Sequence, residues 1–124
     1  KEVEKLNLDF QEFAVAGFML GHASIVSIPK DFNMVEYIHH LFEFSAEESC
    51  GKCFPGRLGS YRGKEMFDQE INKSKKIPLK LLNELLVTMK KGSLCALCGA
   101  IPVPIMNILK YFSDEMKSDI VQEN

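Results

Sequence analysis

The spacing of apolar residues divides the chain into an N-terminal segment and a longer helical region. Over residues 6–21, small or apolar residues recur as on one helix face: Phe10, Phe13, Ala14, Gly17 and Phe18. This spacing predicts a short helix, or two, ending near Gly21. Residues 23–28, Ala-Ser-Ile-Val-Ser-Ile, precede Pro29 and predict a short strand, which needs a partner in this chain or another subunit. We therefore expect residues 1–30 to form a helix-and-strand segment.

After Pro29 the pattern predicts consecutive helices over residues 31–46, 56–73, 78–91 and 102–118. Asp31 is the expected N-cap of the first helix, and Gly92 is the expected cap of the third. The second helix has the thinnest apolar stripe: Leu58, Tyr61, Met66, Phe67 and Ile71. The fourth begins near Pro102 or Pro104, because proline suits the first turn of a helix.

Consecutive helices with short links predict a mainly α fold, an up-down-up-down four-helix bundle over residues 31–118. In this topology the first–second and third–fourth connections lie at the same end, and the second–third connection lies at the other. Residues 119–124 are expected to fray, as chain ends often do.

Composition limits the classes of function that need to be considered. The 124 residues suit one domain, with 46% hydrophobic and 26% charged residues. The formal net charge of −2 argues against a dedicated surface for nucleic acid or anionic membranes. We expect no membrane insertion, because no apolar run approaches the roughly 20 residues that span a bilayer. The charged start of the chain shows no secretory signal, so we expect a cytoplasmic protein.

The cysteines are the strongest candidates for chemistry. They occur only as two C-x-x-C pairs, Cys50-Gly-Lys-Cys53 and Cys95-Ala-Leu-Cys98. The predicted topology brings both pairs to one end of the bundle, where four thiolates could hold one zinc ion or one iron–sulfur cluster. Two disulfides are the less favoured alternative, because secreted disulfide scaffolds are usually smaller and richer in cysteine. The spacing leaves zinc, [2Fe–2S] and [4Fe–4S] open.

The other polar residues suggest no catalytic site. His39 and His40 are adjacent, so they point to different helix faces and do not form an i, i+4 metal pair. We treat His22 as a surface residue. No Ser-His-Asp, Cys-His or paired-carboxylate arrangement stands out. We therefore expect no catalytic site of the chain's own.

The sequence around the first pair resembles a known family. The run Glu48-Ser-Cys50-Gly-Lys-Cys53-Phe-Pro55-Gly56-Arg57-Leu-Gly59 is similar to E-S-C-G-x-C-x-P-C-R-x-G. That signature belongs to the NADH-binding flavoprotein subunit of respiratory complex I and to diaphorase subunits of NAD-linked hydrogenases and formate dehydrogenases. The run Cys95-Ala-Leu-Cys98-Gly99 resembles the family's C-A-L-G segment, and residues 16–21 resemble its A-G-S-M-L-G.

The resemblance implies the helical bundle that carries a [4Fe–4S] cluster in that family. Cys50, Cys53 and Cys95 match three family ligands, Gly56 stands where the family has a cysteine, and Cys98 is additional. This two-plus-two set suits [2Fe–2S] at least as well as [4Fe–4S], and zinc remains the alternative.

The resemblance also implies a place in a larger redox assembly. It suggests an electron-transfer module whose partner subunits carry flavin and further clusters, with the N-terminal helix and strand as docking elements. The chain has no Gly-rich loop for FMN or NADH, so we expect it to bind neither. The alternative is a zinc-binding structural or assembly module without redox activity.

Overall fold

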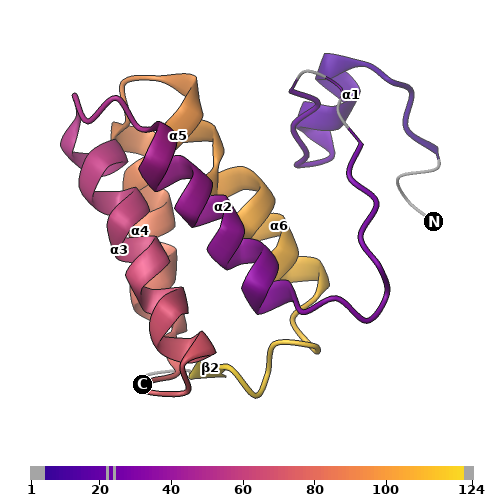
Figure 1. Cartoon of the computed structure of the whole chain (residues 1–124). Coiled ribbons are helices and arrows are strands. Elements are labelled where there is room, and N and C mark those ends of the chain that lie inside the picture. The colour runs from indigo at the N-terminus through magenta and orange to yellow at the C-terminus, as the bar shows by residue number, and fades with distance from the viewer. Residues whose placement is uncertain (1–4, 22, 24, 122–124) are drawn as a thin grey trace. The chain divides into compact units, whose positions relative to one another are not determined.

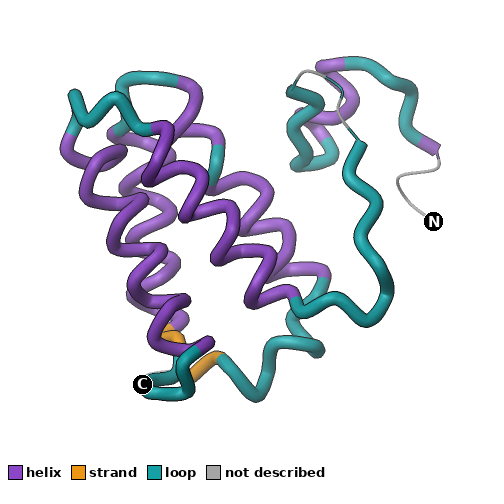
Figure 2. The backbone as a smooth tube through the Cα atoms, in the orientation of Figure 1, coloured by secondary structure: helices purple, strands orange, loops and turns teal. Residues whose placement is uncertain are grey.

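The computed structural model describes residues 5–21, 23 and 25–121, and these residues are mainly helical (Figures 1 and 2). The chain divides into two compact units, Lys1–Phe32 and Asn33–Asn124. Each unit is described by itself below. Within the described residues, no helix combines the length and apolar character needed to cross a membrane.

The first unit contains one short helix, α1 (Phe10–Val15). The Asp9 carboxylate accepts hydrogen bonds from the backbone N–H groups of Gln11 and Glu12, at 2.8 and 3.1 Å, and so caps its N-terminus. The helix stops before Gly17, whose φ of +83° is left-handed, so the predicted helix over 6–21 is only partly present.

The strand predicted over 23–28 is wrong for the residues that the structure describes. Ala23 and residues 25–28 adopt no strand, and Ser24 lies outside the described residues. A strand forms only where another strand satisfies its backbone groups, and the local β propensity of this segment supplies no partner. Ile25 is accordingly 92% exposed.

The second unit is a helical bundle, which confirms the predicted fold class. Its helices are α2 (Met34–Glu48), α3 (Phe54–Ile71), α4 (Leu79–Gly92), α5 (Ala96–Ala100) and α6 (Pro102–Tyr111). The packing runs in a ring, since α2 contacts α3, α3 contacts α4, α4 contacts α6, and α6 returns to α2. Figure 1 shows the long helices side by side in alternating directions, with α5 at one end.

Three helix boundaries differ from those predicted. The N-cap of α2 is Asn33 rather than Asp31, because the Asn33 side chain accepts the Val35 N–H at 2.8 Å. The α3 helix begins two residues early, with Cys53 at its N-cap and a proline in its first turn. Gly92 is the last residue of α4 rather than its cap.

The predicted fourth helix begins at Pro102 as expected, but it is shorter than predicted and an additional helix precedes it. α5 was not predicted, and α6 ends at Tyr111 rather than near residue 118. Pro102 has no N–H to donate back to Cys98, so the helical hydrogen bonds of α5 are not continued into α6. The last backbone bond of α5 runs from the Ile101 N–H to the Leu97 carbonyl at 3.2 Å.

The C-terminal residues 119–121 lie at the end of the bundle opposite α5 and close it. Strand β1 (Ile77–Pro78) pairs in parallel with β2 (Ile120–Val121), with Ile77 opposite Ile120. The Ile77 N–H also donates to the Asp119 carbonyl at 2.9 Å. The prediction that residues 119–124 fray is therefore wrong for 119–121, while 122–124 lie outside the described residues.

The buried face of α3 is made largely of small residues. Gly59 and Gly63 face neighbouring helices, and a Cβ on Gly63 would collide with the Phe42 ring. Leu58 and Tyr61, which were predicted to face inward, are 57% and 59% exposed. Because glycine has no side chain, α2 and α4 can approach α3 closely at these positions. The apolar pattern therefore misidentified the inner face in the first half of α3, whereas Met66 and Phe67 are buried as predicted.

Candidate metal centre

The structure places all four cysteines at one end of the bundle, as the helix order predicts. Cys50 and Cys53 lie in the connection from α2 to α3, while Cys95 and Cys98 lie at the start and within α5 (Figure 1). All four are free thiols. The two loops meet, because the Cys98 Sγ of the second lies 3.8 Å from the Ser49 hydroxyl of the first.

The first pair is shaped by a tight turn and a helix start. Gly51 has a φ of +70°, a conformation that glycine adopts without strain. The Gly51 N–H donates to the Ser49 hydroxyl at 3.3 Å, which ties the turn to the end of α2. Cys53 then begins α3, and its carbonyl accepts the Arg57 N–H at 2.9 Å. The turn therefore leaves Cys50 exposed and Cys53 half-buried.

The second pair is carried by α5. Cys95 is the N-cap of this helix and its carbonyl accepts the Gly99 N–H at 3.2 Å. Cys95 is exposed, whereas Cys98 is 2% exposed. The Cys98 thiol donates to the Ser49 hydroxyl at 3.8 Å, which connects the second pair to the loop that carries the first.

The two deeper sulfurs have opposite electrostatic surroundings. The backbone N–H groups of Leu94 and Gly56 lower the pKa of Cys53, and the Ser93 hydroxyl adds to this effect. Burial raises the pKa of Cys98, and the neighbouring thiols add to that rise while Ser49 opposes it. The surroundings of Cys53 therefore favour its thiolate form, whereas those of Cys98 favour its neutral thiol.

Gly56 leaves space between these two sulfurs. A Cβ at this position would lie 2.9 Å from the Cys53 Sγ and 3.1 Å from both the Cβ and the Sγ of Cys98. Such distances are shorter than ordinary carbon–sulfur contacts, so a side chain would displace one cysteine. The first turn of α3 thus forms a cradle that any Cβ would fill.

The donor set suits a soft metal or an iron–sulfur cluster, because thiolate sulfur is the preferred ligand of both. In the part of the chain that the structure describes, however, no three or more His, Cys, Asp or Glu side chains are already arranged to hold a metal ion. Cys50 and Cys95, the two exposed thiols, lie outside the buried cradle.

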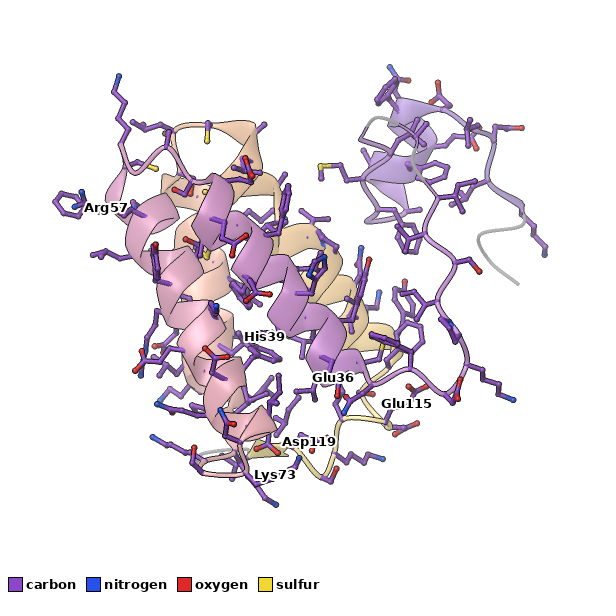
Figure 3. The ribbon with its side chains drawn as sticks, viewed as in Figure 1. Glu36, His39, Arg57, Lys73, Glu115 and Asp119 are labelled. Atoms are coloured by element: carbon purple, nitrogen blue, oxygen red, sulfur yellow. The ribbon has the colours of Figure 1, made fainter. Side chains whose placement is uncertain are left out.

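His39 and Arg57, which could have contributed to the site, make their described contacts with other side chains. His39 lies along α2, and its Nε2 is 2.7 Å from an Asp68 carboxylate oxygen (Figure 3). Arg57 lies at the cysteine end, with its guanidinium 5.3 Å from the centre of the Phe54 ring. His22 lies outside the described residues.

Two serines near the sulfurs were not predicted to be part of the site. Ser49 contacts Cys98, and the Ser93 hydroxyl is buried and without a hydrogen-bond partner of ordinary geometry in the described structure. Ser93 nevertheless contributes to lowering the pKa of Cys53. Their positions in the sequence could have indicated this role, because Ser49 directly precedes Cys50 and Ser93 lies two residues before Cys95.

Comparison with known proteins identifies the same region. Residues 36–119 match the family model described as the NADH-ubiquinone oxidoreductase-F iron-sulfur binding region. An NADH-quinone oxidoreductase subunit of Streptomyces coelicolor is 34% identical over 91% of this chain and 25% of its own length. The HndC subunit of an NADP-reducing hydrogenase of Solidesulfovibrio fructosivorans is 30% identical over 91% of this chain and 23% of its own. The chain thus spans about a quarter of these curated relatives.

A solved structure shares the fold. The NAD+-reducing [NiFe]-hydrogenase in its H2-reduced state matches with a TM-score of 0.69 at 22% sequence identity. The match covers 78% of this chain and 17% of the hydrogenase chain.

Proposed function

The chain belongs to the family of NADH-ubiquinone oxidoreductase-F iron–sulfur binding regions, and from this premise we propose that it is an electron-transfer module. It binds one iron–sulfur cluster through Cys50, Cys53, Cys95 and Cys98. The observation that carries the proposal is that four free thiols lie on two neighbouring loops at the same end of a helical bundle. The cluster supplies reversible one-electron transfer when bound.

The family favours [4Fe–4S], with one cysteine on each iron. The grouping of the ligands in two pairs keeps [2Fe–2S] as the alternative, with one pair on each iron. In either case the chain's own residues hold the cluster and adjust its potential. The Leu94 and Gly56 N–H groups and the Ser93 hydroxyl stabilise negative charge on Cys53, which favours the reduced cluster.

The module works within a larger assembly in this proposal. Its relatives are named as subunits, and the chain spans only about a quarter of their length. We place flavin and nicotinamide binding outside these 124 residues, because their sequence contains no Gly-rich loop for either cofactor. The module would then pass electrons between a flavin and other clusters held by partner subunits.

Metal analysis of the full chain tests the proposal. After anaerobic purification we expect a brown protein with iron and acid-labile sulfide in equal amounts, four of each for [4Fe–4S] and two for [2Fe–2S]. Cys95→Ser should lose most of the iron, whereas Ser118→Ala, an exposed change near the β1–β2 pair, should retain it. A colourless protein holding one zinc ion would instead support a structural module and overturn the electron-transfer proposal.

A further inference from the structure

Gly56 and Cys98 occupy complementary positions on two different helices. Gly56 is buried in the first turn of α3, and Cys98 is buried within α5. A Cβ built on Gly56 would lie 3.1 Å from the Cys98 Cβ and 3.1 Å from its Sγ. The Cys98 side chain therefore fills most of the volume into which any side chain at position 56 would point, and the Cys53 sulfur, 2.9 Å from the same Cβ, borders it. The two positions cannot both carry a side chain without a shift of the backbone or of Cys98.

The Cys98 sulfur is also directed toward the loop of the first pair. Its thiol lies 3.8 Å from the Ser49 hydroxyl, and Gly56 separates it from the Cys53 sulfur on the other side. Cys98 is thus positioned to donate to a group held by Cys53, although it belongs to another helix. Burial keeps water away from this sulfur, as a ligand in a stable site requires.

We infer that positions 56 and 98 are alternative sources of one ligand and form an exchangeable pair: one must be cysteine and the other glycine. A cysteine at 56 would start from α3 and a cysteine at 98 starts from α5, but both side chains enter the same volume. This inference rests on the proposed function for its metal readout. Its steric part concerns the protein alone and can be measured without any cluster.

Exchange of the two residues tests the ligand part. Cys98→Gly should lower the iron and sulfide content on the order of tenfold, and Gly56→Cys combined with Cys98→Gly should restore at least half of it. Gly56→Ala combined with Cys98→Gly is the matched control, because it supplies the same Cβ without a thiol and should restore none. Gly99→Ala is the control for a substitution elsewhere in α5. Its Cβ would lie 3.7 Å from the Ser93 Cβ, which is an ordinary contact distance.

A double-mutant cycle tests the steric part in protein from which all metal has been removed. Gly56→Ala alone should lower the equilibrium constant for folding. Adding Cys98→Gly should recover part of that loss, because it removes the contacts at 3.1 Å with Cys98 but leaves the Cys53 Sγ 2.9 Å from the new Cβ. Additive effects would overturn the pairing, even if a variant folds too poorly for metal analysis. The ligand role would be overturned if Cys98→Gly kept its full iron and sulfide content. It would also be overturned if the parent holds a cluster but Gly56→Cys combined with Cys98→Gly recovers no iron. A parent without iron and sulfide would instead contradict the proposed function, while the cycle still decides the pairing.

Discussion

The two ends of the helical bundle are closed in different ways. At the strand end, β1 and β2 pair through the backbone, and Ile77 and Met116 are 0% and 1% exposed. Glu70, also buried there, forms an ion pair with Lys73 at 3.0 Å. At the cysteine end, Phe54 and Leu94 are 70% and 75% exposed. Figure 3 shows Lys73 and Asp119 at the first of these ends and Arg57 at the second.

The contrast shows that a small bundle need not be closed by apolar packing at both ends. Buried isoleucine and methionine remove much apolar surface from water, and this stabilises the strand end without any ligand. The buried groups at the cysteine end include Gly56 and Cys98, which offer little apolar surface. Under the proposed function, bonds from sulfur to the cluster hold the loops of that end together.

The largest effect is expected from the core that supports both ends. Phe42 is fully buried and its ring centre lies 5.7 Å from that of Phe67, so Phe42→Ala should destabilise the protein by about 3–5 kcal/mol. Urea unfolding followed by circular dichroism measures this change. Phe44→Ala on the same helix is the control, because Phe44 is 47% exposed and should cost much less. Equal losses for both variants would contradict the assigned packing of α2.

A smaller and more local effect is expected at the strand end. Ile77→Ala should cost about 2–5 kcal/mol, because it leaves a cavity beneath the β1–β2 pair. Iron content per folded chain should stay at the level of the parent, since the cysteines lie at the opposite end. The control is Ile71→Ala, at a residue 39% exposed. A loss of cluster in Ile77→Ala at temperatures where the chain stays folded would show that the ends are not independent.

The smallest effect is expected from one hydroxyl at the cysteine end. Ser93→Ala removes a group that stabilises the Cys53 thiolate, so the reduction potential should fall. The fall should be small, because the Ser93 hydroxyl is the weakest of the groups that lower the pKa of Cys53. Protein-film voltammetry measures the potential. Ser45→Ala is the matched control, because its hydroxyl is equally buried and unpartnered but lies within α2. An unchanged potential in Ser93→Ala would exclude this role.

Strong helical periodicity made much of the bundle predictable from sequence. Leu82, Leu86 and Met89 recur at helical spacing, and all three are fully buried on α4. The helix order then determined that both cysteine pairs share one end. The inner face of α3 was not predictable in this way, because Gly59 and Gly63 carry no hydrophobic signal although they contact the core.

Features that depend on distant partners were predicted least well. The pairing of Ile77 with Ile120 joins residues far apart in sequence, and neither two-residue strand has a pattern of its own. The segment at 23–28 shows the converse, because its β propensity suggested a strand, yet its described residues form none. The roles of Ser49 and Ser93 likewise arise only when two loops meet, so the cysteines were identified without their neighbours.

The early end of α6 gives the chain spare length. At about 1.5 Å per residue, the 10 residues of α6 span about 15 Å, whereas the 14 residues of α4 beside it span about 21 Å. Residues 112–119 connect α6 to β2 and could reach about 26 Å if extended. They are instead folded into turns. A change of length in this segment should therefore be tolerated where it leaves the buried Met116 in place, because it alters the path without moving either end of the bundle.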